Sequence, residues 1–395
     1  MIRTIRAATI VATAVATSIA SAQAPAPVVT AASNESVQRF HDIATMITRQ
    51  ANLKPGQVVV ISGSTAYLPF MEDVAIQATQ AGAATFLDVQ TDRLQAAARQ
   101  QSGGRYGYSP PTALEKDLMT KADLWIIFPN VSGPGALPAL SAEQQRAVDS
   151  SLAAWRPSIN TRRSLFVNIP FERDTAGTGM TYAELSRRRW NAMQADYSHI
   201  SAVGESLRSA LANGKSVRVT SPEGTDVTFS LARNGVMVEA IPSLSTRSPQ
   251  PAYRAAVPGG TVVGIVVESS ANGKVRAAYD QCTLPVRDEA IDVNRGRAEN
   301  IHAGSDEACV QKSLNGLRLS AISIGLNPAL TDIRTPAGMP LETAGEGLVS
   351  IYFGDNRFFG GSNNDGTNWY VPLAKATVSV DGRTIVRDGQ IVDRR

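Results

Sequence analysis

The first half of the chain combines short apolar runs with segments whose apolar residues recur at helical spacing. Residues 58–61 form a continuous β-branched run, which is typical of a strand buried on both faces. The pattern predicts helices over 37–50, 68–81 and 142–156, and further strands over 84–89, 124–128 and 164–169. Because strands that alternate with helices usually form parallel sheets, we expect a mostly parallel α/β domain over residues 37–214.

The pattern changes near residue 216 to short alternating runs separated by turn signals. Strands are predicted over 217–220, 227–231, 261–267, 275–279, 318–324, 347–354, 376–380 and 384–386, with a helix over 311–317. Asn272-Gly273 and Asp381-Gly382 are typical of hairpin turns, and 368–370 is expected to be a polar approach to the strand that follows. Residues 215–395 are therefore predicted to form a second, β-rich domain.

The first residues have the pattern of a secretory signal peptide. Arg3 and Arg6 precede an apolar run over 7–20, and Ala22-Gln23-Ala24 is a small-residue cleavage signal. We expect residues 1–24 to be removed and 25–36 to be a disordered tether. Loss of the two arginines lowers the formal net charge from +3 to +1, which does not favour nucleic acid. No later segment has the length of a membrane span, so the sequence predicts a periplasmic or secreted protein.

The two cysteines, Cys282 and Cys309, both lie in the part expected to reach an oxidising compartment. A disulfide between them is therefore predicted, and it would contribute about 3 kcal/mol in the chain-entropy description. Two separate buried thiols are the alternative.

Seven segments occur in an order and spacing found in a known family. They are LKPGQVVVISG, AGAATFLDV, PEGTDVTFSL, PGGTVVG, GLNP, GLVSIYFG and VDGRTIVRDGQ. Together they resemble the thermophilic metallo-aminopeptidases of the aminopeptidase T and aminopeptidase S type, over about residues 37–392. The resemblance implies an α/β domain followed by a β-rich catalytic domain, in a homodimer around an internal cavity. It also implies two divalent metal ions held by two glutamates, two histidines, a tyrosine and an aspartate.

The positions of those metal ligands carry other residue types in this chain. In the family's order they are Thr261, Ala321, Ser350, Arg357 or Phe358, and the group Asn368-Trp369-Tyr370. Serine, threonine, asparagine and alanine cannot neutralise a pair of divalent ions, so we expect no metal and no other cofactor. Ring-cleaving iron dioxygenases of the same fold also need histidine and aspartate at the positions of Asn368 and Tyr370.

Three functional hypotheses of different classes follow. The first is a secreted hydrolase that cleaves peptide-like or other small polar substrates without metal. Its catalytic residues would be Ser350, Asn368, Tyr370 and Thr261, and its substrate-binding residues would be Arg357, Trp369 and Lys375. The second is a pseudoenzyme that binds a small polar or anionic ligand through the same polar side chains. The third is an active metallo-aminopeptidase whose ligands are shifted onto Glu342, Glu346, Asp355 and Asp365.

Overall fold

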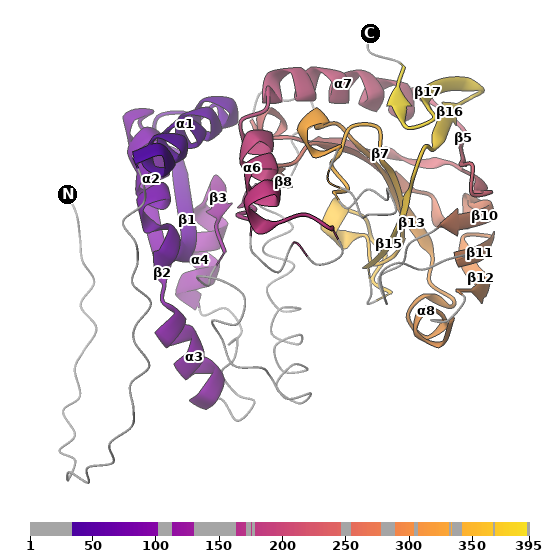
Figure 1. The fold of residues 1–395 in the computed structure, drawn as a ribbon, viewed down its shortest axis with the longest axis horizontal. Helices are drawn as coiled ribbons and strands as arrows, with labels where there is room; N and C mark the ends of the chain where they lie inside the picture. Colours follow the sequence, from indigo (N-terminus) through magenta and orange to yellow (C-terminus); the bar gives the residue numbers. More distant parts are fainter. Residues whose placement is uncertain are drawn as a thin grey trace.

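The structure is a computed structural model in which the chain forms two lobes (Figure 1). It describes residues 34–101, 113–129, 163–170, 175, 178–245, 254–277, 289–303, 307–331, 333, 342–365 and 368–392. Within these residues, no helix is both long enough and apolar enough to cross a membrane. The predicted signal peptide, the helix expected over 142–156 and Cys282 lie outside the described residues, as does the side chain of Cys309. The disulfide therefore stays a prediction.

Sheet A, in the first lobe, is parallel with strand order β2-β1-β3-β4-β8. Its strands are β1 Val58–Ser64, β2 Ala84–Gln90, β3 Leu124–Ile127, β4 Ser164–Val167 and β8 Arg254–Val257. After its first residue, every position of β1 is buried, as its β-branched run predicts. The predicted α/β class is confirmed. One difference concerns β8, which comes from the part of the chain assigned to the second domain.

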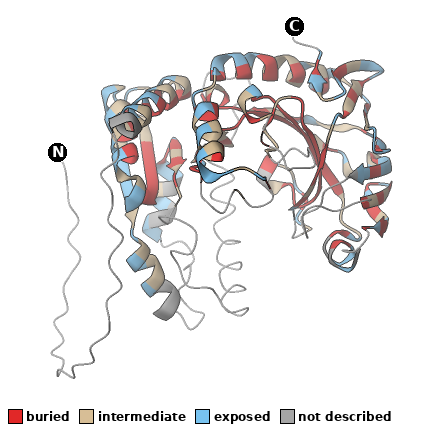
Figure 2. Cartoon of the chain, in the orientation of Figure 1, coloured by how far each residue is buried: buried red, intermediate tan, exposed pale blue. Residues whose placement is uncertain are grey.

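The helices of this lobe are α1 Asn34–Ala51, α2 Leu68–Gln80, α3 Asp92–Gln101 and α4 Ala113–Lys121. α1 begins three residues before the predicted start at 37, so the expected tether is shorter than 25–36. The rings of Phe40 and Phe70 stack with centroids 4.9 Å apart, and this contact joins α1 to α2. Buried residues follow β1 and the inner sides of these helices (Figure 2).

Sheet B, in the second lobe, is antiparallel with strand order β12-β11-β10-β6-β5-β16-β17-β18. Its strands are β5 Val217–Thr220, β6 Asp226–Phe229, β10 Asn272–Ala277, β11 Glu289–Asn294, β12 Arg297–His302, β16 Thr377–Val380, β17 Arg383–Arg387 and β18 Gln390–Ile391. The helix α8 spans Glu307–Leu314, a few residues before the predicted 311–317. The prediction of a turn at Asn272-Gly273 was wrong, because both residues pair within β10. A Cβ on Gly273 would lie 2.2 Å from the carbonyl oxygen of Asp226, so this glycine permits close pairing with β6.

Sheet C is antiparallel with strand order β15-β14-β13-β9-β7. Its strands are β7 Leu231–Glu239, β9 Thr261–Val266, β13 Leu319–Gly325, β14 Val349–Gly354 and β15 Asn368–Leu373. The expected polar approach at 368–370 is instead the start of β15, which pairs with β14. Its polar residues did not suggest a strand, but the edge of β14 offers them a complete hydrogen-bonding ladder.

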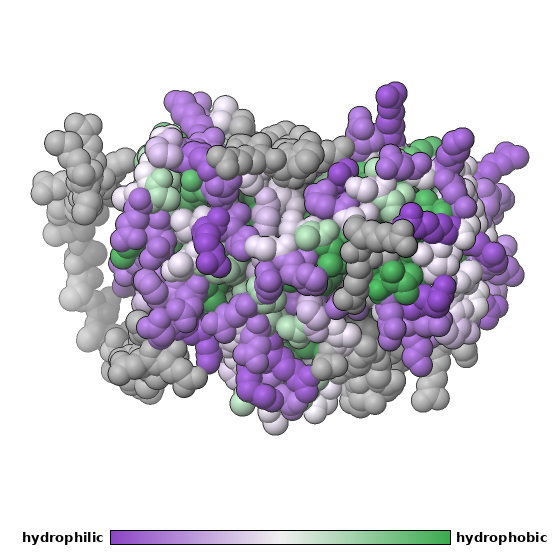
Figure 3. Space-filling model, turned by 90° about the horizontal axis from the view of Figure 1, so that it is seen from above, coloured by the Kyte–Doolittle hydropathy of each residue, from purple (hydrophilic) through white to green (hydrophobic). Residues whose placement is uncertain are grey.

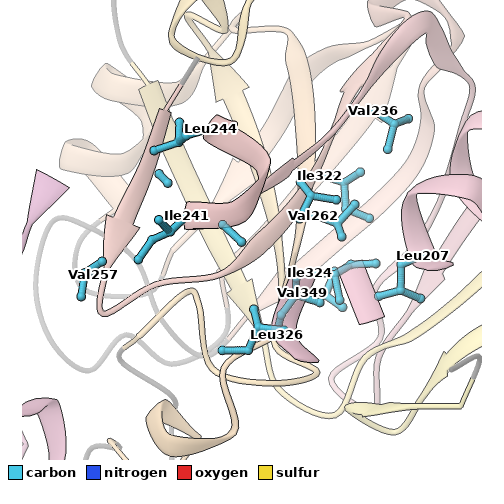
Figure 4. Packing of buried hydrophobic residues seen from close by; sticks show 14 of the residues in the cluster. Leu207, Val236, Ile241, Leu244, Val257, Val262, Ile322, Ile324, Leu326 and Val349 are labelled. Carbon is cyan, nitrogen blue, oxygen red and sulfur yellow. The ribbon is translucent and has the colours of Figure 1, made fainter. Parts of the chain in front are cut away.

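Two helices, α6 Tyr182–Met193 and α7 Tyr197–Asn213, connect the lobes. Asp196 caps α7 by accepting hydrogen bonds from the backbone N–H groups of Ser198 and His199. Leu207 of α7 belongs to the same buried cluster as Val262 and Val349, on one face of sheet C (Figure 4). That packing leaves the opposite face of sheet C for other contacts.

Candidate functional site

Side chains alternate along β14 between two environments. Val349, Ile351 and Phe353 belong to the main hydrophobic core. Ser350 and Tyr352 lie on the opposite face, because successive side chains of a strand point to opposite sides. We call this opposite side of sheet C the site face. It also carries Thr261 of β9, Ser323 of β13, Tyr370 of β15 and Glu239 of β7, as the register shows.

Glu239 lies directly opposite Thr261 in the antiparallel pair of β7 and β9. The Thr261 hydroxyl donates a hydrogen bond to Glu239 Oε2 over 3.2 Å. Burial raises the pKa of Glu239, while the charge of Arg254 and the Thr261 hydrogen bond oppose that rise. The protonation of the Glu239 carboxyl group on the site face therefore depends on its burial, on Arg254 and on Thr261.

Arg254, the first residue of β8, brings a cation from sheet A to this region. Its guanidinium carbon lies 5.3 Å from the centre of the Phe166 ring. Burial lowers the pKa of Arg254, and the nearby Glu239 and Tyr352 oppose that effect. The guanidinium still remains charged, since arginine does not deprotonate in proteins.

Tyr352 joins the polar and aromatic parts of the site face. The Ser323 hydroxyl donates to Tyr352 Oη over 3.3 Å. The Tyr352 ring packs edge-on against Phe359 at 5.0 Å and is tilted against Tyr370 at 5.9 Å. Burial is the main reason that the pKa of Tyr352 rises to about 12. Tyr352 is therefore a neutral hydrogen-bonding group, and the half-buried Tyr370 beside it is more accessible.

Ser350 is completely buried between Ser323 and Pro372 in the strand register. Its hydroxyl has no hydrogen-bond partner among the described residues. A buried hydroxyl without a partner costs about 1–3 kcal/mol, so a group that satisfied it would be favoured. At the position where the resemblance places a histidine, the structure thus holds an unused neutral hydrogen-bonding group.

The register does not bring the four predicted catalytic residues into one pocket. Asn368 lies opposite Gly354, four positions from the residue opposite Ser350, which is about 13 Å along the strand. Its side chain is exposed and donates to the Asp355 carbonyl over 2.8 Å. Thr261 is two strands from Ser350 and two residues along, or about 10 Å across and about 7 Å along. Ser350 and Tyr370 are diagonal neighbours.

The three predicted substrate-binding residues also lie apart. Trp369 is buried in the main core, on the face opposite Tyr370, so strand alternation removes it from the site face. The Arg357 guanidinium donates to Asp355 Oδ2 over 2.5 Å at the start of the 3₁₀ turn η7 Arg357–Phe359. Lys375 is exposed in the turn after β15 and lines a separate cavity of about 260 Å³ with Glu346. It therefore offers no base to Ser350.

Residues 176–393, more than half of the chain, match the model of the family described as NicX, 2,5-dihydroxypyridine 5,6-dioxygenase. The chain belongs to the NicX family. None of the curated proteins matches it.

Two solved structures are similar to this NicX-family chain. The 2,5-dihydroxypyridine dioxygenase from Pseudomonas putida KT2440 is 14% identical with a TM-score of 0.60, over 91% of this chain and 99% of the other. The wild-type AmpT from Thermus thermophilus is 18% identical with a TM-score of 0.63, over 90% and 99%. Identities this low show a common fold. The predicted resemblance to aminopeptidase T is therefore confirmed for the fold, while the family is NicX.

The side chains at the expected metal positions do not fit a divalent ion. Thr261, Ser350 and Asn368 are neutral and separated, and Ala321 has no donor atom. Three of the four acids considered for a shifted site form ion pairs elsewhere: Glu342 with Arg189, Asp355 with Arg357, and Asp365 with Arg318. Among the described residues, no three histidine, cysteine, aspartate or glutamate side chains are grouped closely enough to hold a metal.

Sequence reasoning missed Glu239, Arg254 and Tyr352 of this NicX-family site. A signal for Tyr352 was present, because it alternates with the core residues of its strand at the same parity as Ser350. Glu239 ends a strand and looks like an ordinary terminal acid. Arg254 reaches the site only because β8 joins sheet A, which no local pattern indicates.

Proposed function

We propose that this NicX-family protein binds a small, neutral, hydroxylated ring compound on the site face, without the family's metal. The observation that carries the proposal is the unpartnered buried hydroxyl of Ser350. It lies beside a set of hydrogen-bonding groups on Ser323, Tyr352 and Tyr370. A ligand that offers hydroxyl groups or a ring nitrogen would satisfy such a set better than an ion would.

Apolar residues interleaved with these polar groups support a ring-shaped ligand. Val263, Ala321, Tyr352 and Phe359 form one cluster, against which Met237, Ile265 and Tyr370 pack. Aromatic and apolar side chains with a few placed polar groups are typical of small-molecule sites. The NicX name refers to 2,5-dihydroxypyridine, a planar ring with two hydroxyl groups, and this compound is the first ligand to test.

Metal-independent hydrolysis is the second candidate, and it is the function favoured from the sequence. The free hydroxyl of Ser350 supports it, since such a group can act as a nucleophile. It requires a base, and no described side chain hydrogen-bonds to that hydroxyl. The ring-binding proposal needs no such base, so we place it first. In either case, export through residues 1–24 stays a prediction.

Thermal unfolding of the purified mature chain in chelator tests the proposal. We expect 2,5-dihydroxypyridine to raise the melting temperature, because a ligand that binds only the folded state stabilises it. Tyr370→Phe and Ser350→Ala should each weaken binding about fivefold, the equivalent of one hydrogen bond of about 1 kcal/mol. Ser243→Ala is the matched control, because Ser243 is also a buried serine without a partner, but lies in the 3₁₀ turn η3 Ile241–Leu244.

The outcomes separate the two candidates. Equal binding by the wild type and by both site-face variants would refute this placement of the ligand. Turnover of a dipeptide or ester panel in chelator, lost in Ser350→Ala, would establish the hydrolase instead. A melting temperature raised by zinc, cobalt or manganese would show a metal site that the donor set does not predict.

A further inference from the structure

Four arginines meet in a cavity at one edge of sheet C. The cavity has a volume of about 780 Å³ and is lined by Arg233 of β7, Arg318 before β13, and Arg295 and Arg297 of the β11–β12 hairpin. Among its described lining residues, Glu268 is the single acid. The cavity thus brings together charges from sheets B and C, at positions far apart in the sequence.

Two carboxylates neutralise only one of these arginines. Arg318 donates to Glu268 Oε2 over 2.8 Å and to Asp365 over 2.8 and 3.1 Å. Arg297 lies opposite Arg318 in an isolated bridge and donates to the carbonyl of Gly316 over 3.0 Å. Like charges directly opposite one another are unfavourable unless a counter-charge lies near. Arg233 and Arg295 have no ion pair with the described residues, so positive charge remains in excess here.

Arg295, which lines the cavity, lies in the turn between β11 and β12 and has a strained backbone conformation. Its φ is 46°, a left-handed value that costs an arginine about 1–2 kcal/mol. The backbone around it is fixed: Arg295 N donates to Asn272 Oδ1 over 3.0 Å, and Gly296 N donates to the Ala271 carbonyl over 2.7 Å. A Cβ on Gly296 would lie 1.8 Å from the Glu268 carbonyl oxygen, so the hairpin tip approaches the backbone of Glu268 closely.

Arg233 is also placed by an irregular backbone. The register between β7 and β9 shifts between Leu231 and Val236, and Asn234 within this bulge has a φ of 59°. Bulges redirect side chains away from the regular ladder. Arg233 is exposed as a result and lines the cavity.

We propose that this cavity binds a small organic molecule that carries at least two anionic groups, carboxylate or phosphate. Guanidinium groups pair with both of these anions through two parallel hydrogen bonds. The cavity is larger than one phosphate requires, and its arginines approach from separate elements, which favours two anionic groups over one. The proposal is independent of the ring ligand. Ile265 borders both regions, but the arginines lie on other strands and turns.

Titration calorimetry with citrate, pyrophosphate and inorganic phosphate tests the proposal and distinguishes the two chemistries. We expect citrate or pyrophosphate to bind more tightly than phosphate, and the affinity to fall in high salt because exposed charges are screened. Arg233→Gln and Arg295→Asn should each weaken binding about tenfold, as expected for a lost charge-assisted pair. Arg387→Gln removes an exposed arginine on β17, at the far end of sheet B, and should change affinity less than about twofold.

Arg295→Asn also separates binding from folding. Asparagine adopts left-handed φ more readily than arginine, so this variant should unfold at the same or a higher temperature while it loses affinity. Absence of binding by both citrate and pyrophosphate would overturn the proposal. So would an equal loss of affinity in Arg387→Gln, which would indicate only general attraction by a basic surface.

Discussion

Glu239 and Arg254 bring opposite charges into the same poorly solvated region between sheets A and C. Burial acts on both, and it raises the pKa of the carboxyl group and lowers that of the guanidinium. Each charge partly offsets the cost of burying the other. Replacing one member alone would leave its partner's charge uncompensated, which is the costly case for buried ions. The charge of Arg254, on sheet A in the first lobe, therefore affects the protonation of Glu239 on the site face of sheet C.

The raised pKa of Glu239 predicts a specific pH dependence of stability. A carboxyl group whose pKa is higher in the folded state contributes stability below its ordinary value of 4.5, and that contribution is lost as pH rises through the folded value. Glu239→Gln cannot titrate and keeps an acceptor for Thr261. We therefore expect the unfolding free energy of the wild type, minus that of Glu239→Gln, to fall as pH rises from 4.5.

Denaturant titrations over that range would measure this difference in unfolding free energy. Glu223→Gln, at an exposed glutamate in the turn before β6, controls for the change in net charge. A difference that rises with pH would mean that Glu239 is stabilised as a carboxylate, contrary to the burial argument.

The helix α7 packs against the face of sheet C that is opposite the site face. Its buried side includes Tyr197, Ile200, Leu207 and Leu211, which are spaced for one face of a helix. Gly204 lies on the same side and lets the helix backbone approach β7 closely, since a Cβ there would be 2.7 Å from Val238 Cγ1 and 2.9 Å from Leu326 Cδ1. Because Val238 is the neighbour of Glu239 on β7, the position of α7 also affects the site face.

Gly204→Ala tests this close contact. Overpacking a well-packed site costs about 1–3 kcal/mol, while alanine gains about 1 kcal/mol over glycine in a helix. Both contacts are with branched side chains that are themselves packed, so we expect the clash to dominate and the melting temperature to fall. Ser209→Ala, at an exposed position of the same helix, is the control and should change little. An unchanged or higher melting temperature for Gly204→Ala would show that α7 can move away at little cost.

The two lobes are connected by more than one segment of the chain. After β5 and β6 of sheet B and β7 of sheet C, the chain returns to sheet A as β8. This crossing places Arg254 of sheet A near Glu239 of sheet C. Where described residues form the surface seen from above, it is mainly hydrophilic, with hydrophobic residues in separate patches (Figure 3). The described part of that face therefore has no single large apolar patch of the kind that marks many subunit interfaces.

The homodimer implied by the family resemblance stays a prediction at this scale. We expect sedimentation equilibrium of the mature protein at micromolar concentration to give twice the mass of a single chain, with an interface on another face. A mass close to one chain at that concentration would contradict the dimer. Repeating the run in high salt tests whether association depends on the exposed arginines.

Local patterns in the sequence were enough to predict two kinds of strand: those with a continuous apolar run and those whose side chains alternate between two faces. The β-branched run of β1 and the alternation of β14 predict strands by hydrophobicity alone, and Asp381-Gly382 forms the predicted turn with φ values of 50° and 84°. The residue types at Thr261 and Ser350, at positions where the resemblance places metal ligands, were enough to predict a site without metal, and this stays a prediction. These conclusions depend on properties of single segments, which folding does not change.

Tertiary structure decided which segments meet. Pairing with β14 makes Asn368–Leu373 a strand despite its polar start, and close contact with β6 places Asn272-Gly273 inside β10. Strand register separates Asn368 from Ser350, although both were predicted to be catalytic residues of one site. The approach of Arg254 to Glu239 depends on β8 joining a sheet of the other lobe, so its electrostatic effect exists only in the folded chain. Long-range pairing of this kind has no signal in local sequence, because it is selected by the whole set of strand edges and buried faces.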